Sequence, residues 1–194
     1  MPPIDHIKIY RPLLKGLQNI FEIYPGKGVI IGGIAVSLLG EPRLTADVDV
    51  LILLSATDIS GFIEEAIDVG INPRIKDAET FAKLNRVLLM TYSETNTNVD
   101  IILGMLPFEE EVLKRSRQVT VGDLDINLPT VEDLIIMKAV ADRPKDIIDI
   151  QGLVKTNSNL DMKRIEYWVR IFAEGIDKPD LWQKTNEVIS LALK

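Results

Sequence analysis

Two aspartates stand two positions apart in an apolar stretch of the sequence. Asp47 and Asp49 lie in TADVDVLILL, residues 45–54, whose alternating apolar residues are typical of a β-strand. Because successive side chains of a strand point to opposite faces, both carboxylates lie on one face, roughly 7 Å apart. At an effective dielectric of about 20 they would repel each other by about 2 kcal/mol. A divalent cation is the simplest compensation, and Mg²⁺ is usually held by one or two carboxylates together with substrate phosphates.

A third acid, Asp100, lies in another apolar stretch, NVDIILG, further along the chain. A lone carboxylate in such a strand is compatible with an ion pair to a core arginine, which is a common structural arrangement. If the strand of Asp100 pairs beside the strand of Asp47, however, three carboxylates face one crevice. That is a two-metal arrangement suited to phosphoryl chemistry, and we expect it when the Gly32-Gly33 turn is considered together with the three acids.

Gly32 and Gly33 follow a short apolar strand and precede a helix-forming segment that ends at Gly40. Glycines at a strand-to-helix junction let a phosphate approach the backbone N–H groups of the helix N-terminus. A tight turn without a ligand is the alternative interpretation. The segment lacks the later glycine of a G-x-G-x-x-G motif and the Gly-Lys-Ser/Thr of a P-loop, so neither of those sites is expected.

A charged segment, KAVADRPKDIIDIQGL, begins at Lys138. Pro144 separates two helices, and the three-residue spacing of Asp146 and Asp149 puts both acids on one face of the second helix. One interpretation is compensation of the helix dipole together with solvated lysines, including Lys145. The other is a lysine that reaches a triphosphate and a polar helix face that closes the crevice.

The remaining pattern predicts the elements that must position these residues. Helices are expected at about 12–24 and 34–40, from Thr57 or Asp58 to Val69, after Pro107, and from Thr130, with Asp133 in the capping-box position. Strands are expected at 29–31, 45–54, 86–92 and 99–103, with a loop between about 70 and 85, a turn at Asn96–Asn98 and a hairpin around Gly122 and Asp123. Residues 131–194 are almost wholly helical in pattern.

The composition excludes several classes of protein. A chain of 194 residues that is 46% hydrophobic and 26% charged is typical of one globular domain with a small helical lobe. No run of about 18 apolar residues predicts a membrane span, and the first residues lack the layout of a secretory signal, so a cytoplasmic location is expected. The absence of cysteine excludes disulfides, thiolate zinc sites and thiol nucleophiles. The one histidine, His6, lies near the N-terminus, where we do not expect general acid–base catalysis.

The net charge of −7 argues against a broad basic surface for nucleic acid. It favours a small-molecule or protein partner over a long nucleic acid, although one basic pocket would suffice for RNA. The apolar helices of the last third carry large side chains that fit either a core or a homodimer surface, namely Trp168, Phe172, Trp182 and Leu191.

Together these residues resemble a known family. The order GG…R-x-T-x-D-x-D resembles the signature of the DNA polymerase beta-like nucleotidyltransferase superfamily, and it stands here at Gly32, Gly33, Arg43, Thr45, Asp47 and Asp49. Lys138 followed by Lys145-Asp146-x-x-Asp149 is similar to the second signature of the AbiEii-like branch, with Lys145 in place of an arginine. That branch includes nucleotidyltransferase toxins of toxin–antitoxin systems.

The resemblance implies an α/β (α+β) nucleotidyltransferase fold, which is a short mixed sheet flanked by helices. The catalytic core with its N-terminal helix would span residues 1–128, and a C-terminal helical lobe packed on it would span 129–194. The implied activity is Mg²⁺-dependent transfer of a nucleoside monophosphate from an NTP to an acceptor hydroxyl of RNA, a protein or a small molecule. A cognate antitoxin would be a further partner.

The resemblance also assigns roles to residues. Asp47, Asp49 and Asp100 would be catalytic and would bind two Mg²⁺ ions, with Asp100 as the candidate base. The nucleotide would be held by Gly32 and Gly33 at its phosphates and by Thr45 and Lys145. Lys138 and Asp146 would be the catalytic residues of the second signature.

Other classes of protein fit parts of the pattern. A catalytically silent module of the same fold would bind a nucleotide or regulate a partner without releasing pyrophosphate. A sugar-nucleotide glycosyltransferase with an Asp-x-Asp Mn²⁺ site would need a larger donor domain than the residues before Asp47 provide. A haloacid-type phosphohydrolase would need a hydroxyl residue two positions after Asp49, where Leu51 stands.

Overall fold

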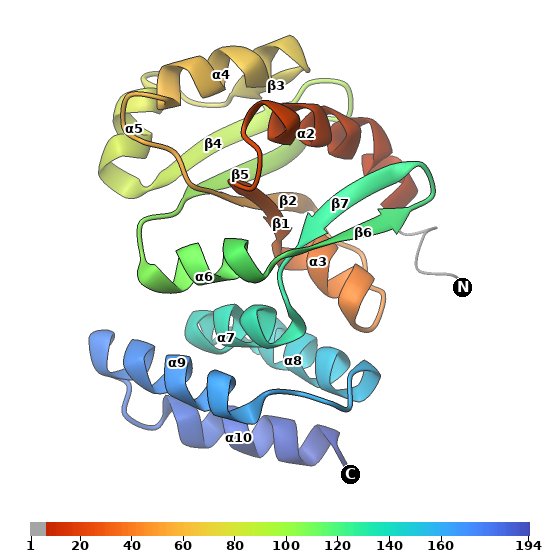
Figure 1. Ribbon diagram of the computed structural model, residues 1–194, viewed down its shortest axis with the longest axis vertical. Coiled ribbons are helices and arrows are strands. Elements are labelled where there is room, and N and C mark those ends of the chain that lie inside the picture. The colour runs from red at the N-terminus through yellow and green to blue at the C-terminus, as the bar shows by residue number, and fades with distance from the viewer. Residues whose placement is uncertain (1–6) are drawn as a thin grey trace. The chain divides into compact units, whose positions relative to one another are not determined.

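The computed structural model describes residues 7–194 (Figure 1). The chain forms two compact units: the sheet unit, which contains the residues up to Ile34 and Leu44–Pro129, and the helical unit, which contains Ala35–Arg43 and Thr130–Lys194. The helical unit therefore combines the C-terminal helices with a segment, Ala35–Arg43, that precedes Leu44–Pro129 of the sheet unit in the sequence. His6 lies outside the described residues.

A five-stranded mixed sheet forms the centre of the sheet unit, with the strand order β1-β2-β5-β4-β3. Only the β2–β5 pair is parallel, and the other three pairs are antiparallel. In chain order the strands are β1 (Gly28–Ile31), β2 (Asp47–Ile52), β3 (Ile71–Pro73), β4 (Val87–Tyr92) and β5 (Thr97–Leu103). The predicted α/β class with a short mixed sheet flanked by helices is therefore confirmed.

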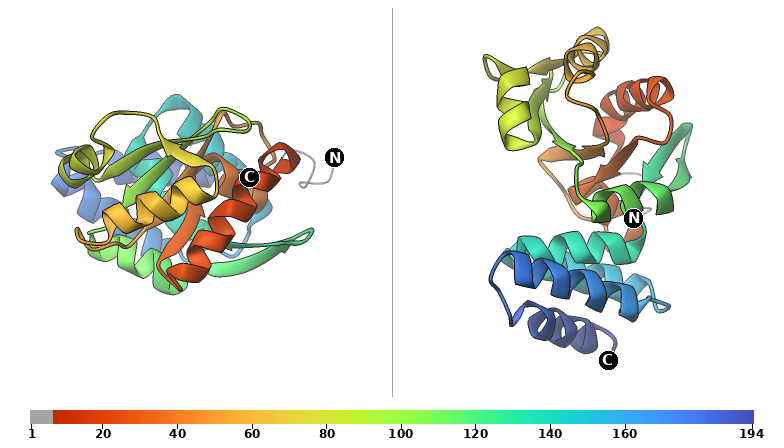
Figure 2. Two further views of the ribbon diagram at one scale, coloured as in Figure 1. Left: turned by 90° about the horizontal axis from the view of Figure 1, so that it is seen from above. Right: turned by 60° about the vertical axis from the view of Figure 1, so that its left-hand side comes forward.

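One face of this sheet is fully buried. Its side chains come from aligned positions of the three central strands, and none is more than 7% exposed: Val48, Val50, Leu88, Met90, Tyr92, Val99 and Ile101. Helices α2 (Arg11–Ile23) and α4 (Ile59–Asp68) lie next to each other over this face, and α5 (Ala78–Asn85) packs against β4 (Figures 1 and 2). The helical spacing of the apolar residues in α2 gives it one face to bury, which supplies much of the driving force for this layer.

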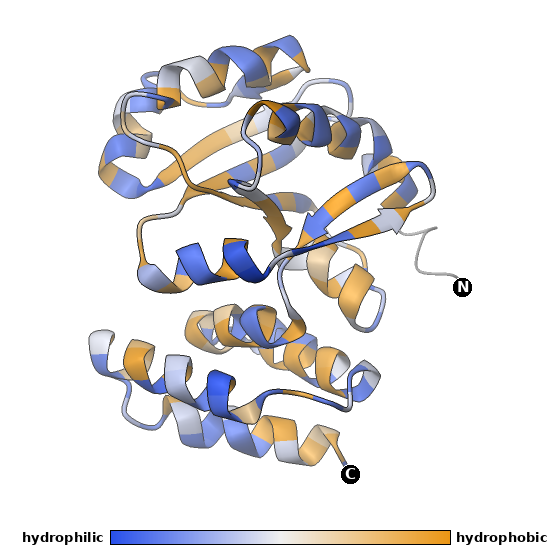
Figure 3. Cartoon of the chain, in the orientation of Figure 1, coloured by the Kyte–Doolittle hydropathy of each residue, from blue (hydrophilic) through white to orange (hydrophobic). Residues whose placement is uncertain are grey.

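Smaller elements complete the sheet unit. A 3₁₀ turn (η1, Lys8–Tyr10) leads into α2, and helix α6 (Pro107–Arg115) follows β5. Strands β6 (Arg117–Val121) and β7 (Leu124–Leu128) form the predicted hairpin around Gly122, whose φ of +66° suits a glycine. The alternation of hydrophobic and hydrophilic residues along this hairpin is visible in Figure 3 and places one side of β7 against β1 and α2.

The helical unit consists of the later residues of α3 and four further helices. Helix α3 (Gly32–Leu39) crosses the boundary between the units, and the others are α7 (Val131–Ala141), α8 (Pro144–Thr156), α9 (Met162–Gly175) and α10 (Leu181–Ala192). Thr130 caps α7 as expected, because its hydroxyl accepts a hydrogen bond of 3.3 Å from the Asp133 N–H. Trp168 belongs to the core of this unit at 8% exposure, whereas Leu191 is exposed. Over residues 7–194, no helix has the length and apolar character needed to cross a bilayer.

The structure corrects three expectations about local elements. The region expected as a loop before residue 86 contains β3 and α5, and both are short. β3 contains a proline, which is unusual in a strand, and α5 is flanked by Asp77 and Arg86 at positive φ instead of by glycine. Of the turn expected at Asn96–Asn98, only Asn96 adopts positive φ, and the next two residues begin β5. Gly32 and Gly33 lie within the first turn of α3 instead of before it.

Candidate active site

Three carboxylates share the second face of the sheet. Asp49 of β2 lies directly opposite Asp100 of β5, and Asp47 lies two residues earlier on β2. Because paired residues of neighbouring strands point to the same side, all three side chains are on one face, and all are partly exposed. The expected pairing of the Asp100 strand with the Asp47 strand is thus present.

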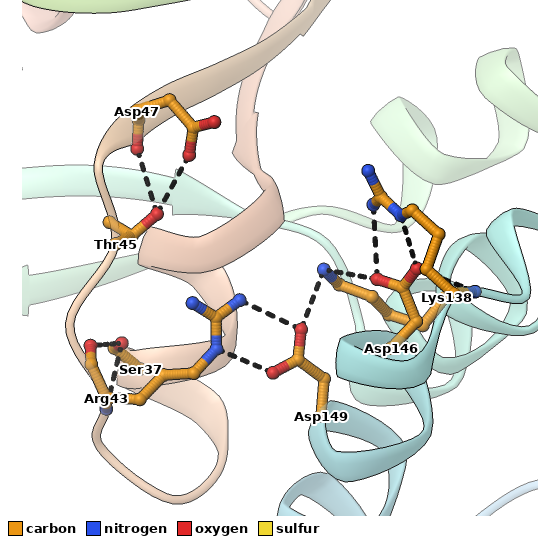
Figure 4. Close-up of polar contacts among 8 residues, drawn as sticks. Ser37, Arg43, Thr45, Asp47, Lys138, Asp146 and Asp149 are labelled. Atoms are coloured by element: carbon orange, nitrogen blue, oxygen red, sulfur yellow. Dashed lines mark hydrogen bonds and ion pairs between the residues drawn. The ribbon is translucent and has the colours of Figure 1, made fainter.

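Asp47 is held by a short chain of hydrogen bonds within the sheet unit. The Thr45 hydroxyl donates to Oδ1 of Asp47 at 2.9 Å (Figure 4). The hydroxyl of Tyr10 in turn donates to the backbone carbonyl of Thr45. Burial, together with the nearby negative charge of Asp47, raises the pKa of Tyr10, so this phenol stays protonated and remains a donor. Sequence analysis missed Tyr10, because a tyrosine 35 residues before Thr45 carries no motif.

Asp49 lies against the first residue of α3. A Cβ atom built on Gly32 would be only 1.8 Å from Oδ2 of Asp49, and the φ of Gly32 is +64°. Any residue with a side chain would therefore displace the carboxylate and strain the backbone. The first N–H groups of α3 have no partners within the helix, so this end of α3 is favourable for negative charge.

Asp100 is paired with Arg74, which follows β3 directly. One guanidinium nitrogen, Nη2, contacts Oδ1 of Asp100, and both side chains are partly exposed, at 26% and 35%. Asp100 therefore combines the two arrangements weighed from the sequence, because it has an arginine partner and also lies beside Asp49 in the sheet.

The three carboxylates offer oxygen ligands only, which suits Mg²⁺. Within residues 7–194, no three acidic, histidine or cysteine side chains are gathered closely enough to hold a metal ion on their own. A cation at these carboxylates would need further ligands, and substrate phosphates commonly complete the shell of a protein-bound Mg²⁺.

The second signature forms a buried ion network inside the helical unit (Figure 4). The ammonium group of Lys138 on α7 lies 3.2 Å from Oδ1 of Asp146 and 2.8 Å from Oδ2 of Asp149, both on α8. Arg43 donates through Nε and Nη2 to both oxygens of Asp149, at 2.6 and 2.9 Å. Arg143 donates to Asp146 through its side chain and its backbone N–H. Three cationic side chains thus neutralise two buried carboxylates.

This network refines the two interpretations of the second signature. Lys138 is only 5% exposed, so it is not a solvated lysine, whereas Lys145 is exposed as that interpretation expects. Arg43 belongs to the first signature in sequence, and its partner Asp149 belongs to the second. The catalytic assignment of Lys138 and Asp146, and the nucleotide-binding assignment of Lys145, stay predictions.

The electrostatics of the network keep both acids ionised. Burial raises the pKa of the Asp146 carboxyl, but the hydrogen bond from Arg143 and the charge of Lys138 outweigh it and hold that pKa below its usual value. For Asp149, burial likewise raises the pKa, and the hydrogen bonds from Arg43 and Lys138 lower it by more.

Replacing Gly32 by alanine should disturb both the fold and the Asp49 carboxylate. We expect Gly32→Ala to lower the free energy of unfolding by at least about 2 kcal/mol, because the side chain meets Asp49 and the backbone is left-handed. Gly61→Ala in α4 is the control: its Cβ would meet no atom within 4 Å, and alanine should stabilise that helix by up to about 1 kcal/mol. Urea denaturation measures both, and equal effects would contradict the close approach at Gly32.

Removing the Lys138 charge should destabilise the helical unit. Lys138→Met leaves Asp146 and Asp149 buried without the cation that lies between them, at a cost of roughly 2–4 kcal/mol, since each acid keeps one arginine. Lys145→Met removes the same charge from an exposed position and should change the stability by less than about 0.5 kcal/mol. Urea denaturation of both variants at pH 7 tests this difference, and similar losses would refute it.

The lowered pKa values predict the acid sensitivity of this unit. Both acids have a folded-state pKa below the unfolded value of about 3.9, so they add stability above about pH 4 that is lost as the pH falls through the folded-state values. The free energy of unfolding, measured in urea at pH 7, 5, 4 and 3, should fall most steeply below pH 4. Asp149→Asn should have a shallower fall, and a curve parallel to the wild type would contradict this origin.

Solved structures with the same fold support this architecture. The chain is similar to an antigenic nucleotidyltransferase-like protein from Paracoccidioides brasiliensis, with a TM-score of 0.57, 14% identity and coverage of 94% of this chain and 93% of that one. It is also similar to the antibiotic-resistance factor ANT(2'')-Ia, with a TM-score of 0.60, 12% identity and coverage of 87% and 94%. A third similar structure is the lincomycin-bound lincosamide antibiotic adenylyltransferase LnuA, with a TM-score of 0.50, 15% identity and coverage of 74% and 97%. At these identities, the likeness shows the fold alone.

The sequence itself identifies the family. No curated protein sequence matches the chain. Residues 13–170 match the family described as "Nucleotidyltransferase of unknown function (DUF6036)", and this range includes both signatures and all three carboxylates of the sheet. Because the match spans most of the chain, this protein belongs to that family of nucleotidyltransferases.

Proposed function

We propose that the protein transfers a nucleoside monophosphate from an NTP to an acceptor hydroxyl in a Mg²⁺-dependent reaction and releases pyrophosphate. The observation that carries this proposal is the direct opposition of Asp49 and Asp100 on parallel strands, with Asp47 on the same face. Membership of a nucleotidyltransferase family supports the class of reaction.

The residues of the sheet unit take distinct roles in this proposal. Asp47 and Asp49, together with Asp100, would hold two Mg²⁺ ions jointly with the phosphates. Such ions would supply positive charge to the attacking oxygen and to the leaving pyrophosphate. Thr45 keeps Asp47 in place through its hydroxyl, and the N-terminal residues of α3, Gly32 and Gly33, offer backbone N–H groups to the phosphates.

The chemical step is an in-line displacement at the α-phosphorus. A bond forms between the acceptor oxygen and phosphorus, and the bond from phosphorus to the bridging oxygen breaks, so pyrophosphate leaves with that electron pair. The proton of the acceptor hydroxyl goes to Asp100, of which one oxygen, Oδ1, is occupied by Arg74.

The acceptor and the partners are proposed from the second signature and from the net charge. The likeness of Lys138 and Lys145-Asp146-x-x-Asp149 to the AbiEii-like signature supports a search for a cognate antitoxin and for an RNA or protein acceptor. The net charge of −7 supports a protein or small-molecule acceptor over a long nucleic acid.

Asp47→Asn tests the proposal directly. We expect the wild type to gain thermal stability with one or more NTPs only when Mg²⁺ is present, and to release pyrophosphate when an acceptor is supplied. Ligand at about 100 times its dissociation constant adds about 2.7 kcal/mol to the free energy of unfolding. Asp47→Asn should lose both responses while keeping the unfolding transition of the free protein.

Two results would change the proposed function. NTP binding without pyrophosphate release, with every acceptor class tested, would indicate the catalytically silent module. Full turnover by Asp47→Asn would exclude the metal site at these carboxylates. Asp125→Asn, at a partly exposed position of β7 near the hairpin turn in the sheet unit, is the matched control and should retain turnover.

A further inference from the structure

Arg74 lies in a row of residues that crosses the sheet. Its backbone N–H donates to the carbonyl of Leu89 at 3.0 Å, which extends the β3–β4 pairing by one residue. Leu89 is paired with Asp100, and Asp100 is paired with Asp49. The guanidinium group therefore reaches over β4 to arrive at the carboxylates from the side opposite α3.

The contact between Arg74 and Asp100 does not use all the hydrogen-bonding groups of the two side chains. It joins one guanidinium nitrogen to Oδ1, although an arginine and a carboxylate can pair through two parallel hydrogen bonds. In the described part of the chain, Oδ2 of Asp100 accepts no hydrogen bond, and Nε and Nη1 of Arg74 donate none. Both side chains also remain partly exposed. A partly exposed ion pair of this kind contributes little to stability, so its charge matters more for the site than for the fold.

A cation fixed at Asp100 opposes the binding of a second cation there. It takes one oxygen of the third carboxylate, and it repels a divalent ion at the same place. The negative phosphates of an NTP offset this repulsion when they arrive together with the metal. The charge of Arg74 thus favours a metal that comes with its nucleotide over a metal that binds alone.

We propose that Arg74 is a resident counter-cation of Asp100 and makes metal binding at the three carboxylates depend on the nucleotide. Arg74 is a positioning residue in this scheme, because it acts through Asp100. The inference rests on the proposed function, since it requires that Asp47, Asp49 and Asp100 bind the metal.

Binding of Mn²⁺ in the absence of nucleotide tests this inference. Free Mn²⁺ is measured by electron paramagnetic resonance for the wild type and for Arg74→Gln. We expect Arg74→Gln to bind Mn²⁺ about tenfold more tightly, because the variant frees an oxygen of Asp100 and removes a nearby positive charge. The midpoint of thermal unfolding should shift by no more than about 3 °C, which shows that the variant is folded.

Three further variants test whether the effect on Mn²⁺ binding comes from the charge of Arg74, from the shape of its side chain, or from its position beside Asp100. Arg74→Lys keeps the charge and should bind Mn²⁺ within about threefold of the wild type. Arg11→Gln removes the same charge from an exposed ion pair with Asp123 and should leave Mn²⁺ binding unchanged. Adding Arg74→Gln to Asp100→Asn should give much less than the gain seen in the wild-type background, because the two residues act together.

The result that overturns the inference differs from the one that overturns the proposed function. If Asp47→Asn weakens Mn²⁺ binding but Arg74→Gln binds no more tightly than the wild type, Arg74 is not a counter-cation and the metal site stands. If adding Asp47→Asn to Arg74→Gln leaves the Mn²⁺ binding of Arg74→Gln unchanged, the metal site and the inference both fail. Weaker binding by Arg74→Gln also overturns the inference.

Discussion

The mutual repulsion of three carboxylates on one face of a sheet is the constraint on which the rest of the sheet unit depends. The pairing of β2 with β5 brings Asp49 and Asp100 opposite each other, where two negative charges are unfavourable. Different elements compensate: a threonine hydroxyl at Asp47, the beginning of α3 at Asp49, and a guanidinium at Asp100. Apolar residues, which occupy most other positions of β2 and β5, would avoid this repulsion at the same three positions.

The helical unit has the opposite arrangement, since two of its carboxylates are removed from water. Asp146 and Asp149 are almost fully buried, and their desolvation is compensated only because three cations converge on them. Arg43 is one of these cations, and it stands two residues before Thr45 in the sequence. The residues of the first signature are therefore divided between the units, because Arg43 pairs with a carboxylate of the helical unit while the aspartates lie in the sheet.

Local patterns predicted most of the helices and strands and the shared face of Asp47 and Asp49, because periodicity is a property of a single element, whereas the fold class came from the resemblance of the two signatures to a known family. The pairing of the Asp100 strand with the Asp47 strand was predicted only by assuming that the three carboxylates form one site. The sequence of a strand does not determine which other strand pairs with it. Arg74 could not be found, because it follows a three-residue strand that contains a proline and reaches Asp100 across another strand. The burial of Lys138 was missed for a similar reason, as its neutralising acids belong to the next helix.

The division of the chain inside α3 has a consequence for the order of folding. The helical unit is discontinuous in sequence, because Ala35–Arg43 must meet residues that follow Pro129. On a ribosome, the whole of Leu44–Pro129 is made before the partners of this segment exist. Until then, the carbonyl of Leu39 lacks the side chain of Asn157 that donates to it at 2.7 Å, and Gly40 lacks the helix residue Leu153 against which it packs. The segment that precedes β2 thus gains its final surroundings only after α8 has been synthesised.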